Sequence, residues 1–457
     1  MDFSQDSVWK LLMQFTLLFG AMLVGNMIRR QIPFIRRFYI PSALIGGVLV
    51  LGLKQIPAVA AIIDDEVMQM ITYHCLGLGF AAMAIKTPKE KRKVPTVKIV
   101  ESGAIMAGSY LLQAILGLGI SIAFYFVAKS FYAAGLILPM GFGQSTGSAL
   151  SWGSKYESLG FAGGASYGLA VASIGFLVGS VVGVIALNRA IRKGKVKPRR
   201  QNTEEVEVLS EKNEIPNSES VDKLSIQFCF VALAYGLSYG FMKLLALTGV
   251  KAIGDLAWGL NFLWALLFGF LIRLTVQFLN KRKVVNHNYV SNHLMDRISG
   301  FCFDLMIIAG VAAIDFEDIS KNWLLLVVTC VLGATLTFFY VKKATKHAYP
   351  GYETEGFVTN FGTVTGTVST GMILLREIDP NFVTPAASNI VLQNIPSLVM
   401  LAPLLLTMGF AASSLKNTFI MLGVYVVLFV AYNIFLFRKK IFKKKFKTPE
   451  EPWSEEQ

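Results

Sequence analysis

Two short segments far apart in the chain share an unusual pattern of glycine and hydroxyl residues. Both follow F-G-x-x-T-G-[S/T], and the second begins 219 residues after the first. One runs from Phe142 to Ser148 and the other from Phe361 to Thr367. Glycine lets the backbone approach a ligand closely, and hydroxyl and carbonyl oxygens suit a small hard cation such as Na⁺. The pattern therefore indicates two places where backbone and hydroxyl groups could bind an ion or a small molecule.

The rest of the chain indicates which elements must position these segments. Of its 457 residues, 54% are hydrophobic and 16% are charged, whereas a soluble domain carries about 25% charged residues. The apolar residues form blocks of about 20, the length of a helix that crosses a bilayer. The net charge of +14 comes from basic clusters between these blocks, which is typical of cytoplasmic membrane loops rather than of nucleic-acid binding. We expect an all-α polytopic membrane protein.

Hydropathy predicts five spans in a first repeat (1–187), a disordered cytoplasmic linker at 188–224, five spans in a second repeat (225–410), and an extra span with a basic cytoplasmic tail at 411–457. The two glycine-rich segments fall in apolar stretches at about 133–153 and 356–376, which are too rich in Gly, Ser and Thr for simple spans. The expected spans are 8–28, 39–57, 67–85, 99–128, 160–187, 225–246, 253–279, 298–314, 321–341, 383–408 and 416–437.

Charge distribution orients these spans in the cell membrane. If the basic clusters are cytoplasmic, the N-terminus lies outside and the C-terminus inside. Every cluster falls inside only if segments 133–153 and 356–376 are re-entrant hairpins, the first entering from outside and the second from the cytoplasm. Because five is odd, the second repeat must have inverted topology.

Broken helices in hydrocarbon need cover by protein or by a water-filled cavity, and paired breaks in inverted halves point to a transporter site. Half-helix N-termini carry partial positive charge suited to an anion. The alternative is a small-residue packing face, which is also our interpretation of Gly175, Gly179 and Gly183. The expected substrate-binding residues are Gly143, Ser145, Thr146, Gly147, Ser148, Gly362, Thr365, Gly366, Thr367 and Arg376.

Candidate sodium ligands are residues with oxygen donors in or near the breaks and spans. Asp304 lies within a span, where an ionisable residue indicates function. It could bind a cation, carry a proton, or be a paired structural acid. The asparagines could equally form interhelical hydrogen bonds, and Arg376 could be a solvated helix end. The five candidates are Gln144, Thr363, Asp304, Asn389 and Asn394.

The chain resembles the bacterial glutamate:sodium symporter family. The resemblance rests on Tyr39-Ile40-Pro41 with Gly46-Gly47, on Gly141 to Gly153, and on Asn360 to Gly371. It implies inverted five-helix repeats with two re-entrant hairpins, a homodimer, an elevator motion, and sodium-driven uptake of L-glutamate without any other cofactor. It implies no catalytic residues. A carrier of the same architecture for another small anion, or one coupled to protons, is the alternative; a membrane-embedded enzyme is the alternative from another class.

Overall fold

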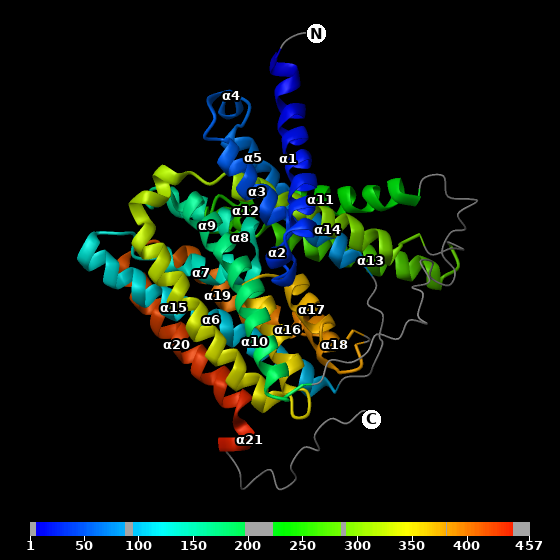
Figure 1. The fold of residues 1–457 in the computed structure, drawn as a ribbon, viewed down its shortest axis with the longest axis vertical. Helices are drawn as coiled ribbons and strands as arrows, with labels where there is room; N and C mark the ends of the chain where they lie inside the picture. Colours follow the sequence, from blue (N-terminus) through cyan, green and yellow to red (C-terminus); the bar gives the residue numbers. More distant parts are fainter. Residues whose placement is uncertain (1–5, 87–94, 197–222, 285–288, 381, 442–457) are drawn as a thin grey trace. The chain divides into compact units, whose positions relative to one another are not determined.

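The computed structural model describes residues 6–86, 95–196, 223–284, 289–380 and 382–441 (Figure 1). Within these ranges all regular structure is helical and no strand occurs. The predicted all-α fold class is therefore confirmed. The centre of the expected linker (197–222) and the basic tail from residue 442 lie outside the described residues.

The described chain divides into two compact units, and each unit draws helices from both halves of the sequence. The first half supplies α1, α3, α4 and α5 to unit 1 and helices α6 to α10 to unit 2. The second half supplies α11 to α14 to unit 1 and α15 to α21 to unit 2. The end of α1 and the short α2 belong to unit 2. In each half of the sequence, therefore, the earlier helices belong to unit 1 and the later helices belong to unit 2.

Unit 1 is a bundle in which small residues allow close helix packing. Gly46 on α3 lies against Ile308 of α14, and Gly77 on α5 lies against Tyr235 of α11. Such small-residue contacts are typical of helix association in membranes. Its helices are α1 (Asp6–Gln31), α3 (Ser42–Leu53), α4 (Pro57–Ala60), α5 (Asp65–Ile85), α11 (Lys223–Ala246), α12 (Lys251–Gly259), α13 (Asn261–Lys281) and α14 (Asn292–Ala312).

Unit 2 is built around two 33-residue helices, α6 and α15, which pack against each other. Asp315 caps α15 by accepting a 2.7 Å hydrogen bond from the Glu317 amide, which satisfies a donor at the helix start. The elements of unit 2 are α2 (Pro33–Arg37), α6 (Thr96–Ala128), η1 (Ala134–Leu136), α7 (Ile137–Pro139), η2 (Met140–Gln144), α8 (Thr146–Glu157), α9 (Gly164–Leu177), η3 (Val178–Val182), α10 (Gly183–Arg192), α15 (Phe316–Ala348), α16 (Glu353–Thr365), α17 (Val368–Arg376), α18 (Ala386–Leu392), α19 (Asn394–Ala411), α20 (Leu415–Leu436) and α21 (Arg438–Ile441).

Eight helices in the described residues are long and apolar enough to cross a membrane, and the bent pair α18–α19 makes up to nine. Large apolar side chains remain exposed on these helices, including Val127, Val399 and Val427. Many exposed large apolar side chains on helices of this length are costly in water but match lipid. The chain is therefore a multi-pass membrane protein.

Two expected spans are wrong as continuous helices. The span at 39–57 is a 12-residue helix, α3, that ends at Leu53, because Pro57 restricts Ile56 to extended backbone. The span at 253–279 is interrupted at Leu260, whose ψ of 35° leaves the helical region. The start of the expected linker is also wrong, since α10 continues to Arg192.

Candidate functional site

The first break separates the π-helical turn η2 from helix α8 in unit 2. Ser145 lies between them with extended backbone, at φ 174° and ψ 168°. Its hydroxyl accepts a 3.1 Å hydrogen bond from the Ser148 amide and lies 3.2 Å from the Ser148 hydroxyl. Ser145 therefore acts as the N-cap of α8, and its hydroxyl forms a buried pair with that of Ser148 at the helix start.

The second break separates α16 from α17 and repeats this capping arrangement. Gly366 and Thr367 leave the helical region, and the Thr367 hydroxyl accepts from the Thr370 amide at 3.3 Å. The hydroxyls of Thr367 and Thr370 are also 3.3 Å apart. Helices α8 and α17 thus begin in the same way. In each, a hydroxyl residue caps the helix, and its hydroxyl lies next to that of a second hydroxyl residue three positions further along the chain.

The break does not fall at the same place in the two copies of the sequence motif. The shared pattern aligns Ser148 with Thr367, whereas the N-caps are Ser145 and Thr367. In the first copy the T-G dipeptide therefore begins the second helix, and in the second copy it ends the first helix. When the two copies are aligned by sequence, their helix caps therefore differ in position by three residues.

The backbones of α16 and α17, the two helices that flank the second break, are in contact. A Cβ on Gly362 of α16 would lie 2.7 Å from the Cα of Gly371 on α17, so glycine at the crossing is what allows this distance. The two helices lie side by side in Figure 1. Gly362, Gly366 and Thr367, all expected site residues, therefore share one compact helix–break–helix element.

Both breaks meet at α9, on the face that carries Gly175. A Cβ at this position would lie 2.8 Å from the Thr365 carbonyl oxygen of the second break and 3.2 Å from the Phe142 Cα of the first. One turn further, a Cβ on Gly179 would lie 3.0 Å from the Thr365 hydroxyl. Gly175 and Gly179 therefore form a helix-packing face, as expected, and both breaks pack against it.

Helix α6 supports the breaks with two polar side chains one turn apart. The Tyr110 ring lies so close to Gly143 of the first break that a Cβ there would be 2.5 Å from it. The Gln113 amide donates to the Val364 carbonyl of the second break at 3.0 Å and to the Thr337 hydroxyl at 3.1 Å. Tyr110 and Gln113 were absent from the sequence-based candidates. A glutamine inside an apolar span was the available signal for Gln113.

Replacing Gln113 with leucine is expected to lower both thermal stability and transport. The Val364 carbonyl would lose its side-chain donor, and an unsatisfied buried acceptor costs about 1–3 kcal/mol. Ser109→Ala is the control, because the Ser109 hydroxyl donates to the Ile105 carbonyl of its own helix at 2.7 Å. Melting temperature and uptake of both variants provide the measurement. Equal behaviour of the two variants would contradict a role for Gln113.

Several buried oxygens around the breaks have no hydrogen-bond partner among the described residues. They include the Thr146 hydroxyl, the Gln113 amide oxygen and the Ser180 hydroxyl, whose residues are at most 1% exposed. Buried polar groups are normally satisfied, so each of these oxygens is a candidate contact for a bound ion or ligand. Helices α8 and α17 begin at the two breaks, and the N-terminus of each carries partial positive charge.

A second polar cluster joins α15, α16 and α18. The rings of Tyr349 and Tyr352 stack with centroids 5.2 Å apart. The Asn389 amide donates to the Tyr352 hydroxyl at 3.0 Å, and the Asn360 amide donates to the Gly356 carbonyl at 2.9 Å. The side-chain oxygens of both asparagines have no donor among the described residues. Asn389 therefore holds a buried amide oxygen in unit 2, as a cation ligand requires.

The remaining candidate residues lie partly away from the breaks and partly in the helices that flank them. Asp304 belongs to unit 1, on an exposed face of α14. Arg376 is exposed at the end of α17, where its guanidinium lies 5.4 Å from the Phe382 ring centroid. Asn394 is half-buried and donates to the Val391 carbonyl at 3.2 Å, and Gln144 is half-buried in η2. The hydroxyls of Thr363 and Thr365 bond within α16.

The last residue of α8, Glu157, has a carboxyl group with a perturbed pKa. Partial burial raises the pKa of Glu157, the hydrogen bond from the Ala165 amide opposes this shift, and the charge of Asp318 reinforces it. That hydrogen bond is 3.0 Å long. Because the folded pKa is raised, the folded protein holds the proton more tightly than the unfolded chain does. The free energy of unfolding should therefore decrease as pH rises through the interval between the ordinary glutamate pKa and the raised one.

Glu157→Gln should remove this part of the pH dependence, since the amide does not titrate. The measurement is melting temperature against pH in detergent. The control is Glu317→Gln, which changes a carboxylate that is 83% exposed and should leave the wild-type slope in place. An unchanged slope in Glu157→Gln would show that Glu157 is not responsible.

Comparison with known proteins identifies the family. A family model described as sodium/glutamate symporter matches residues 9–349, a range that includes the first break and ends before the second. No curated protein matches the chain. Because the match covers most of the 457 residues and the fold is a multi-pass helical one, the protein is a membrane transporter. The chain belongs to the sodium/glutamate symporter family.

Proposed function

We propose that this protein imports L-glutamate, or a similar small carboxylate, together with Na⁺, and that the site is where the two breaks meet on α9. The observation that carries the proposal is the convergence of the two breaks on one glycine face of α9, where Gly175 lies against Phe142 just before the first break and Thr365 just before the second. Na⁺ enters as a second transported species, consistent with the family.

The substrate carboxylates would bind to the helix N-termini. Free amides and the partial positive charge at the start of a helix favour anions. Two such starts in unit 2 match the two carboxylates of glutamate. The unpaired Thr146 hydroxyl would donate to a carboxylate oxygen, and Gly143, Ser145, Gly147, Ser148, Gly362, Thr365, Gly366 and Thr367 would form the surrounding backbone and hydroxyl shell.

Sodium would bind to neutral oxygens in this account. In the described residues, no three His, Cys, Asp or Glu side chains form a metal-binding group. The side-chain oxygens of Asn389, Asn360 and Gln113 have no donor within the described part of the chain, and Gln144 and Thr363 lie beside the breaks. Neutral ligands do not balance the charge of a buried cation, and burying an unbalanced charge costs free energy. The negatively charged substrate would therefore stabilise the bound Na⁺. Binding of each would then strengthen binding of the other.

Alternating access would follow from movement of unit 2, which holds both breaks. The repeated order in which the halves supply helices to the two units supports inverted five-helix repeats, each with a re-entrant hairpin. We infer an elevator motion of unit 2, a homodimer, an external N-terminus and a cytoplasmic C-terminus.

Binding measured by titration calorimetry tests this function. With purified protein in detergent, L-glutamate should bind much more tightly in Na⁺ than in K⁺, and Na⁺ should bind more tightly in L-glutamate. Reciprocity requires that both effects have the same size. Malate and citrate are the comparison ligands for the alternative of another anion. Tight binding of glutamate that does not depend on Na⁺ would contradict the proposed coupling.

A further inference from the structure

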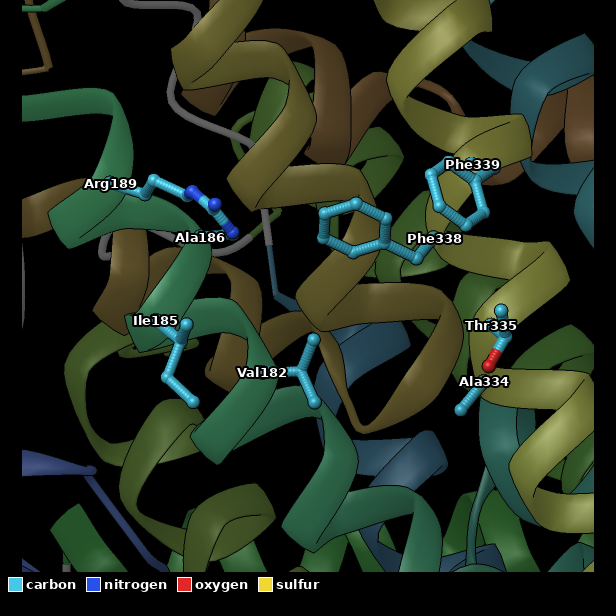
Figure 2. A pocket seen from close by; sticks show the side chains of 8 residues that line it. All are labelled: Val182, Ile185, Ala186, Arg189, Ala334, Thr335, Phe338 and Phe339. Carbon is cyan, nitrogen blue, oxygen red and sulfur yellow. The ribbon is translucent and has the colours of Figure 1, made fainter. Parts of the chain in front are cut away.

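A groove on unit 2 lies outside the site described above. It has a volume of about 310 Å³ and runs between the η3–α10 segment and α15 (Figure 2). The two helices that form it belong to membrane-spanning segments. Its lining residues are Val182, Ile185, Ala186, Arg189, Ala334, Thr335, Phe338 and Phe339.

The groove is apolar at one end and basic at the other. Figure 2 shows Val182 and Thr335 at one end, and Arg189 extending toward Phe338 at the other. Lys342 follows on the same face of α15, with its ammonium 5.6 Å from the Phe338 ring centroid. The Thr335 hydroxyl bonds to the Val331 carbonyl of its own helix at 2.8 Å, so the lining near it is effectively apolar.

The two cations at the basic end are available to a ligand. Among the described residues, neither Arg189 nor Lys342 forms an ion pair. Both follow long apolar stretches near the end of a spanning segment, the position at which basic side chains meet lipid headgroups. A positively charged end and an apolar channel together fit a phosphate group joined to an acyl chain.

We propose that this groove binds one anionic phospholipid, with its phosphate on Arg189 and Lys342 and an acyl chain along Val182, Ile185 and Ala334. The lipid would pack on η3, the turn whose Gly179 contacts Thr365 of the second break. A lipid bound in the groove would thereby pack against the segment that follows α9 and supports the proposed transport site.

Native mass spectrometry and thermal unfolding of the detergent-purified protein test the proposal with phosphatidylglycerol and phosphatidylcholine. The wild-type protein should retain one phosphatidylglycerol molecule preferentially and should melt at a higher temperature with it. In the double variant R189Q/K342Q, the affinity for phosphatidylglycerol should fall about tenfold or more, since each basic residue near a membrane contributes about 1 kcal/mol.

Two further variants separate the groove from general charge effects. Lys321→Gln removes a charge near the start of α15, at the opposite end of the helix from Lys342, and it should keep the lipid preference. Ala186→Trp leaves both cations and fills the groove, so it should abolish retention while melting like wild type without lipid. Equal retention of both lipids by wild type, or undiminished phosphatidylglycerol binding in both R189Q/K342Q and Ala186→Trp, would overturn the proposal.

Discussion

Replacing Gly175 with valine is expected to reduce glutamate uptake more than tenfold. Any Cβ at this position would lie 2.8 Å from the Thr365 carbonyl oxygen and 3.2 Å from the Phe142 Cα. These neighbours are backbone atoms of the two breaks, so neither can rotate away. Overpacking of this kind costs about 1–3 kcal/mol, and each 1.4 kcal/mol corresponds to about a factor of ten in an equilibrium. The breaks would be pushed apart at the place where the substrate is proposed to bind.

The control for this variant is Gly119→Val on α6, where a Cβ would meet nothing within 4 Å. It makes the same change in a spanning helix and should leave uptake within about twofold of wild type. Gly175→Ala, with a smaller side chain, should fall between the two. Protein amount, size-exclusion profile and circular dichroism must be compared so that uptake is measured on folded protein. Wild-type uptake by folded Gly175→Val would contradict the convergence of the two breaks on α9.

The second large effect is expected for Thr146→Val, which removes one hydroxyl and keeps the side-chain shape. That hydroxyl is buried and has no partner among the described residues, so its loss should not lower the melting temperature. A hydrogen bond to a charged group is worth about 1.5–3 kcal/mol. We therefore expect the concentration of glutamate at half-maximal uptake to rise about tenfold or more.

Two variants control for this change. Thr146→Ser restores the hydroxyl and should recover most of the affinity. Thr345→Val removes a buried hydroxyl that bonds to the Val341 carbonyl of its own helix at 2.8 Å, and it should leave half-saturation unchanged. If Thr146→Val lowers the melting temperature and leaves half-saturation as in wild type, the hydroxyl is structural and our assignment is wrong.

Hydropathy alone could locate most of the helices because a membrane span needs a long apolar run, and run length can be counted in the sequence. The interruptions at Leu53 and Leu260 were missed because a hydropathy average over a whole span hides the few polar residues that follow them, Lys54, Gln55 and Asn261. Breaks near Ser145 and Gly366 could be placed because the same glycine and hydroxyl motif recurs at an offset of 219 residues. Their three-residue displacement could not be predicted, since it depends on which hydroxyl caps the following helix.

The partners of the breaks could not be read from the sequence. Gly175 resembles any small residue of a packed helix, and only the fold shows that Thr365 and Phe142 lie against it. Gln113 is 251 residues from its partner Val364, a separation that local patterns cannot bridge. The division into two units is likewise a property of tertiary contacts, because each unit combines segments from both halves of the chain.

Uptake of labelled L-glutamate into proteoliposomes tests the central claim most directly. Purified wild-type protein is reconstituted and assayed with an inward Na⁺ gradient and, in parallel, with an equal K⁺ gradient; empty liposomes give the background. Our account predicts that glutamate accumulates above its external concentration with the Na⁺ gradient alone and that Thr146→Val largely abolishes this accumulation at low glutamate. Equal uptake in Na⁺ and K⁺, or no uptake by protein shown to be folded and inserted, would contradict it.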